Sequence, residues 1–112
     1  MDFNTAWDGE INEAVHALVF SGEGVEARIV NHNGMRRLSV NGFISREPVP
    51  DYCNSWADAG PIIESNKLDF TWFMDRERVL VAHEPTDTIH QSTNPLRAAM
   101  IVFLMMKDNH NG

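Results

Sequence analysis

The sequence has a single cysteine, Cys53, among its 112 residues, which excludes an internal disulfide and favours a reducing cytosol. It also lacks a membrane-spanning segment, because the apolar run at residues 98–106 is well short of the roughly 20 residues that a spanning helix needs. The N-terminus, MDFNTAWDGEI, has neither the basic start nor the apolar stretch of a signal peptide. We therefore expect a cytoplasmic protein with no membrane partner.

Basic residues are scarce as well. Nine Lys and Arg against sixteen Asp and Glu give a net charge of -7, which repels nucleic-acid phosphates unless the basic groups cluster strongly. Arg36 and Arg37 are the one adjacent basic pair, so we expect no nucleic-acid partner. The Gly-Glu-Gly segment at 22–24 lacks the spacing and the lysine of a nucleotide-binding loop, and we expect no cofactor.

The sequence does contain enough apolar material for one core, since 43% of the residues are hydrophobic and six Phe and three Trp are among them. A chain of this length is typical of one domain. We predict a single domain over residues 1–112, with a disordered tail at 108–112.

The N-terminal half shows a helical pattern followed by strand patterns. Apolar residues recur at helical spacing from Ile11 to Val19, and Thr5 or Asp8 can cap this first helix. The pair Asn33-Gly34 suits a tight hairpin turn between two strands in residues 25–40, and Asn41-Gly42 suits a further turn before Phe43 and Ile44, so we expect two or three strands here.

The C-terminal half repeats this order. A short helix is expected through residues 56–65, with Asn54 or Ser55 as its cap, and a hairpin through 67–83 follows, with its turn at 75–77. Residues 84–93 read as a polar loop before a last helix that begins at Asn94-Pro95. The order α-β-β-(β)-α-β-β-α predicts an α+β helix/sheet sandwich with three helices and one mostly antiparallel sheet of 4–5 strands.

Two blocks, CNSWADAGPII at 53–63 and NPLRAAMIVFLMM at 94–106, resemble the NinX family of small proteins that lambdoid phages and prophages encode. The family has no known function, and the pattern between the blocks is similar to phage ABA-sandwich domains. This resemblance implies a phage origin, an α+β sandwich and the cytoplasm of a bacterial host. The strand-rich segment at 22–50 departs from the shorter family link, and Gly60 stands where a Trp is expected. No catalytic residue is implied.

The segment HEPTDTIH holds the side-chain types of a metal site: His83, Glu84, Asp87 and His90. Pro85 opposes a helix here and Asp87 replaces the second His of the zinc-protease pattern, so a solvated loop is favoured and we predict no metal. Cys53 with His32 or His83 is a possible nucleophile pair, but no nucleophile signature surrounds it, and we name no catalytic residue.

Asp58 and Arg97 are the charged residues of the two blocks. A bidentate ion pair between them is favoured over an anion site at Arg97, which would use the helix N-terminus near Asn94. Trp56 is a further interaction candidate, although most aromatic rings are expected in the core. The last helix is apolar on all sides and must be covered. We therefore predict a homodimer through Ala99, Met100, Phe103, Leu104 and Met106.

Three functions remain open. The favoured one is a non-enzymatic accessory protein that binds a host or phage protein, for example to blunt a host defence, because the chain is small and acidic and shows no catalytic set. The alternatives are a binder of a small anion such as a nucleotide, through Arg97, and a small metal-dependent hydrolase built on residues 83–90.

Overall fold

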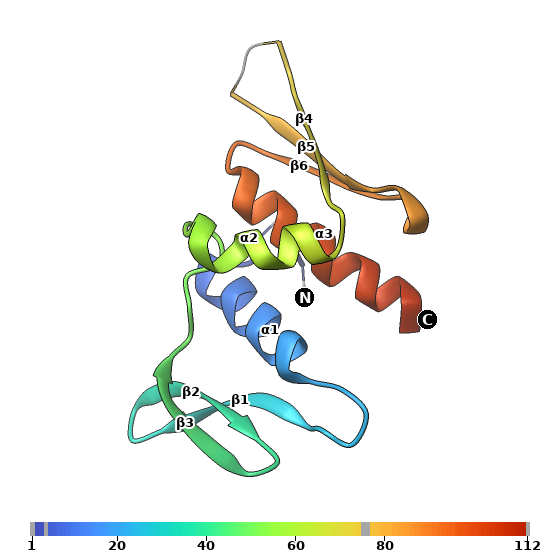
Figure 1. Ribbon diagram of the computed structural model, residues 1–112. Coiled ribbons are helices and arrows are strands. Elements are labelled where there is room, and N and C mark those ends of the chain that lie inside the picture. Colours follow the sequence, from blue (N-terminus) through green and yellow to red (C-terminus); the bar gives the residue numbers. More distant parts are fainter. Residues whose placement is uncertain (1, 4, 75–76, 112) are drawn as a thin grey trace.

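The computed structural model describes residues 2–3, 5–74 and 77–111, and for 109–111 only the helical backbone. Three helices and six strands follow one another along the chain (Figure 1). Their bounds are α1 Asp8–Phe20, β1 Ala27–His32, β2 Met35–Val40, β3 Phe43–Pro48, α2 Trp56–Ser65, β4 Asp69–Trp72, β5 Val79–His83, the 3₁₀ turn η1 Glu84–Thr86, β6 Thr88–Ser92 and α3 Pro95–Asn111.

The α+β class and the antiparallel pairing are confirmed. The strands form two separate three-stranded antiparallel sheets, with orders β1-β2-β3 and β4-β5-β6, rather than one sheet of 4–5 strands. The additional strand is β6, which lies where a polar loop is predicted. Four of its five side chains are polar, yet it pairs with β5 from Val79↔Ser92 to His83↔Thr88 and contacts α3, so tertiary pairing overrides its weak local pattern.

Both Asn-Gly pairs make the predicted hairpin turns. Asn33 and Gly34 have φ of 54° and 80°, and Asn41 and Gly42 have φ of 49° and 90°. Positive φ at both central residues is typical of type I′ turns, whose twist matches that of the flanking strands. These turns join β1 to β2 and β2 to β3. The predicted turn at 75–77 falls partly on Asp75 and Arg76, which lie outside the described residues.

Two of the three predicted helix caps are confirmed. The Ser55 hydroxyl accepts from the backbone N–H of Asp58 at 3.4 Å, and the Asn94 side chain caps α3 just before Pro95. The predicted caps of α1 are wrong, because Asp8 is already the first helical residue and Trp7 holds the cap position. The Glu10 carboxylate accepts the backbone N–H of Trp7 at 3.4 Å, so a side chain from inside the helix satisfies this end.

Helix α3 forms the centre of the core. It lies against β5 and β6 on one side and against α1 and α2 on the others (Figure 1). Residues 98–104 and Met106 are all at most 8% exposed. The five residues predicted to form a homodimer contact are therefore covered within one chain, and homodimer formation itself stays a prediction. Among the described residues, no helix is long and apolar enough to cross a membrane. The helix continues to Asn111, and Gly112 lies outside the described residues.

The first sheet stands apart from this core. It contacts α1 and lies at the opposite end of the molecule from the second sheet (Figure 1). Leu38 and Ser39 are its buried residues, whereas Met35, Phe43 and Ile44 are exposed. The molecule measures 46 × 28 × 25 Å as a result. The core thus belongs to the three helices and the second sheet, and the first sheet is an appendage on α1.

A pair of methionine substitutions tests this division. Met100→Ala removes a side chain that is 0% exposed, and we expect the free energy of unfolding to fall by about 2–5 kcal/mol because a cavity remains. Met35→Ala removes a side chain that is 52% exposed on the first sheet, and we expect a loss below about 0.5 kcal/mol. Urea unfolding of both variants measures the difference, and equal losses would contradict the division.

Candidate functional site

The N-terminal ends of α1, α2 and α3 are joined by a network of polar side chains. Asn94, at the start of α3, donates from Nδ2 to the carbonyl of Cys53 at 2.8 Å and to Oδ1 of Asn54 at 3.2 Å. Its own Oδ1 accepts the backbone N–H groups of Leu96 and Arg97 at 3.0 and 3.1 Å. Asn94 therefore caps α3 and ties the two sequence blocks together with one side chain.

Arg97 makes the strongest contacts of this network. Its Nη1 lies 2.6 Å from Oδ1 of Asp8, and its Nη2 donates to the carbonyls of Phe3 at 3.2 Å and Ala6 at 2.5 Å. The Arg97 side chain is 19% exposed and that of Asp8 43%. One guanidinium thus fastens the start of α3 to the first turn of α1 and to the segment before it.

The ion pair predicted between Arg97 and Asp58 is wrong. Asp58 lies in the first turn of α2, where its backbone N–H bonds to Ser55, and the residue is exposed. Asp8 takes its place, although it is 89 positions from Arg97 in the sequence. Asp8 lies outside both sequence blocks. The prediction considered the charged residues of these blocks alone and therefore missed Asp8.

A second part of the network surrounds the backbone before α2. Asn12 of α1 donates to Oδ1 of Asp51 at 2.9 Å and accepts the backbone N–H of Cys53 at 3.0 Å. Asn54 donates to Oδ2 of Asp8 at 3.2 Å and to Oδ1 of Asp51 at 3.1 Å. No buried side-chain N or O atom of the described residues lacks a partner. These polar groups are satisfied by one another, which is the pattern of a structural network.

Cys53 lies inside this network and is fully buried. Burial and the nearby carboxylate of Asp8 raise the pKa of its thiol to about 12, against the opposing effect of Arg97. The thiol donates to the Asp8 carbonyl at 3.9 Å, and neither His32 nor His83 bonds to it in the described structure. Since the thiolate is the nucleophile and its population is negligible here, the geometry favours a structural role for Cys53.

A buried pair next to the network was missed by the sequence reading. The Tyr52 hydroxyl lies 2.7 Å from Nδ1 of His16, and both residues are buried between α1 and the segment before α2. Burial lowers the pKa of His16 and, together with the charge of Asp58, raises that of Tyr52, so a neutral imidazole and a neutral phenol share this hydrogen bond. A histidine beside the apolar positions Ile11 and Val15 of a helix is a weak signal for a buried imidazole, and it does not indicate Tyr52, which lies 36 positions away.

The four metal candidates do not converge. Nδ1 of His83 shares a hydrogen bond of 2.7 Å with Oγ1 of Thr86, and Asp87 has the left-handed φ of 52° at the end of η1. His90 lies on β6, where burial, with a contribution from Arg97, lowers its pKa. In the described part of the chain, no three His, Cys, Asp or Glu side chains are grouped to hold a metal ion.

Trp56 differs from Arg97 and Asn94 because it is exposed. It is 57% exposed at the first turn of α2 and rests against Phe70, with ring centroids 6.1 Å apart. Trp7 is 77% exposed at the start of α1. Arg97, by contrast, is engaged by Asp8 and two carbonyls, so its guanidinium is not offered to an anion. The candidate residues therefore divide into a filled polar network and exposed rings beside it.

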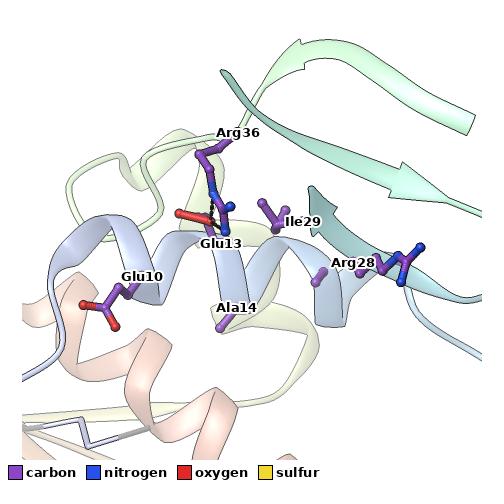
Figure 2. Close-up of a pocket in the computed structure, with 8 residues that line it drawn as sticks. Glu10, Glu13, Ala14, Arg28, Ile29 and Arg36 are labelled. Carbon is purple, nitrogen blue, oxygen red and sulfur yellow. Dashed lines mark hydrogen bonds and ion pairs between the residues drawn. The ribbon is translucent and has the colours of Figure 1, made fainter. Parts of the chain in front are cut away.

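A cleft between α1 and the first sheet is the second feature of interest. Alanines from α1 and β1 and the side chain of Ile29 line it, and Arg36 of β2 spans it to reach Glu13 of α1 at 2.7 Å (Figure 2). Glu10 and Arg28 lie at its two ends (Figure 2). Small side chains and one ion pair thus hold the appendage on the core.

The geometry defines a small α+β protein whose helix ends are clamped by a polar network rather than opened as a pocket. Residues 8–107 match the family model described as "Bacteriophage P22, NinX". The chain belongs to this NinX family, and the match spans both the polar network and the first sheet. No curated protein and no solved structure matches it.

Three substitutions test the role of the ion pair. We expect Arg97→Met to lower the free energy of unfolding by about 2–3 kcal/mol and Asp8→Asn by about 1–2 kcal/mol, because each leaves charged or polar groups of the network without a partner. Asp58→Asn, the matched control, should change it by less than about 0.5 kcal/mol because this side chain is exposed. Equal effects of Asp8→Asn and Asp58→Asn in urea unfolding would contradict the assignment.

Thiol labelling tests the buried cysteine. With a pKa of about 12 and no exposure, Cys53 in the folded protein should resist a thiol-reactive dye at neutral pH. The same protein in denaturant should label with one equivalent, since the chain has one cysteine. Rapid labelling of the folded chain would show that the thiol is accessible and would contradict a structural role.

Proposed function

We propose that this NinX-family protein is a non-enzymatic binding protein that acts on a host or phage protein in the host cytoplasm, and that its first sheet is the contact surface. The observation that carries the proposal is the exposure of apolar side chains on this sheet. Phe43 is 82% exposed, Met35 52% and Ile44 42%. Exposed apolar groups gathered on one element are typical of a surface that a partner covers.

The way the sheet is attached supports this function. It lies outside the core, and its buried residues are Leu38 and Ser39. Three strands are more than is needed to link α1 to α2, because the chain closes the helical core without them. A sheet that adds little to the core, and that the NinX match includes, is better explained by a contact outside the chain.

The polar network supports the same function because its reactive side chains are already bound within the chain. The side chains with catalytic or anion-binding chemistry, Cys53 and Arg97, are engaged within the chain, the first by burial and the second by Asp8. Because these groups hold the helices together, a partner must be bound by other, exposed side chains. The exposed apolar side chains of the first sheet, Met35, Phe43 and Ile44, give it the composition of an interface.

A co-purification experiment with matched variants tests the proposal. Tagged protein is recovered from infected and uninfected bacterial lysates as wild type, as Met35→Ser/Ile44→Ser, and as Met74→Ser/Ile89→Ser. The second pair is a control of the same residue types on the other side of the molecule, where Met74 is 102% and Ile89 55% exposed, which is more than Met35 and Ile44.

We expect one or more proteins to co-purify with the wild type and with the control. The amount recovered should fall by at least about tenfold with the first-sheet variant, since losing an interface anchor removes more than about 1 kcal/mol of binding free energy. Circular dichroism shows that each variant is folded. Either no reproducible partner or equal recovery by both variants would contradict the proposal.

A further inference from the structure

Charge is divided unevenly between the first sheet and the rest of the molecule. Four of the nine basic residues, Arg28, Arg36, Arg37 and Arg46, lie between residues 27 and 48, together with one acidic residue, Glu47. The remaining residues carry five basic and fifteen acidic side chains. A chain with a net charge of -7 therefore has one basic element, which the linear sequence conceals because its arginines come from three strands.

The strand register shows which face of this sheet is open. Directly opposed residues of antiparallel strands share a face, and successive residues alternate. Ile29 and Leu38 form a pair on the face toward α1, where Arg36 meets Glu13. By this alternation the opposite face carries Val30 and His32 from β1, Met35, Arg37 and the buried Ser39 from β2, and Ile44 from β3. Arg28 alternates onto the same face at its edge, where it also borders the end of the cleft beside α1.

Two arginines of the open face, Arg28 and Arg46, are exposed and Arg37 is half-buried, and none of the three has a carboxylate partner in the described part of the chain. Among the described residues, no salt bridge reaches Arg28, Arg37 or Arg46, whereas Arg36 is neutralised by Glu13 on the other face. Arg37 donates to the carbonyl of Arg46 and lies 3.3 Å from Sδ of Met35, which holds its guanidinium against the sheet. A shallow hollow forms there, lined by His32, Arg37, Ile44, Ser45 and Arg46.

We propose that the open face of β1–β3 binds an acidic segment of a partner protein in which Asp or Glu residues alternate with apolar ones. This inference rests on the proposed function and adds the chemistry of the partner. An arginine guanidinium donates two parallel hydrogen bonds to a carboxylate, so Arg28, Arg37 and Arg46 supply charge recognition. Val30, Met35 and Ile44 lie between them and supply apolar contacts of the kind that protein interfaces use.

A nucleic acid fits this face less well. Phe43, the exposed Phe of the sheet, pairs with Val40 and is on the α1 side. Among the described residues, the open face therefore offers a base no larger ring than the imidazole of His32. A phosphate chain longer than the sheet would also run onto the acidic remainder of the molecule. A short acidic peptide segment can contact the arginines without extending over the acidic remainder of the molecule, so it avoids this repulsion.

Fluorescence anisotropy with defined probes tests the proposal. The probes are a labelled peptide of about ten residues in which Glu alternates with Leu, the same peptide with Gln for Glu, and a single-stranded oligonucleotide of about ten bases. We expect the acidic peptide to bind at least about tenfold more tightly than the other two, and to weaken as NaCl rises from about 50 to about 300 mM, since salt screens the charges.

Charge-reversed variants locate the binding. Arg28→Glu/Arg46→Glu should weaken the binding of the acidic peptide by at least about tenfold. Lys67→Glu/Lys107→Glu, which changes the net charge equally but lies outside the sheet, should weaken it by less than about threefold. Both changed pairs are judged folded by circular dichroism before binding is compared.

Three outcomes would overturn the inference: tighter binding of the oligonucleotide, no binding of the acidic peptide up to about 1 mM, or self-association of the free protein through this face, seen as a shift in light scattering that Arg28→Glu/Arg46→Glu abolishes. Each is distinguishable from failure of the proposed function. A partner whose recovery depends on Met35 and Ile44 but does not change with the arginine variants would support the proposed function. It would contradict the inference that the partner offers an acidic segment.

Discussion

The contact of Arg97 with Asp8 is the interaction on which the arrangement of the helices depends. Helix α3 is apolar around its circumference and would pack against any apolar surface, because the hydrophobic effect has no direction. The ion pair of 2.6 Å and the carbonyl contacts of the same guanidinium have a direction, and they set α3 against the start of α1. Apolar burial supplies the stabilisation of this core, and a half-buried charge pair determines its geometry.

The remaining polar network follows from that contact. Once the starts of α1 and α3 are joined, Asn94 reaches the carbonyl of Cys53 and Asn12 reaches its N–H, so the backbone before α2 is fixed from both sides. The raised pKa of Cys53 is a consequence of the same enclosure. Residues that would carry chemistry on another protein serve here as connections between helix ends, and this leaves the first sheet, attached to α1 through small side chains and Arg36, as the accessible element.

How much of the structure could be predicted depended on the range of each interaction. The Asn-Gly turns and the Ser55 and Asn94 caps were predictable because each is decided within about four residues by backbone and side-chain geometry. Strand β6 was not, since its polar residues have no strong strand preference and are ordered by β5 and α3. The partner of Arg97 lay 89 residues away, beyond the reach of any local pattern.

The sequence by itself determined the α+β class, the antiparallel hairpins, the family and an apolar last helix, because local backbone preferences and hydrophobic periodicity are written along the chain. The tertiary structure alone decided that the strands divide into two sheets, that α3 is covered within one chain, and that Asp8 answers Arg97. It also gathered Arg28, Arg37 and Arg46 on one element of an acidic protein. Charges meet through space, and their neighbours are set by strand pairing rather than by sequence order.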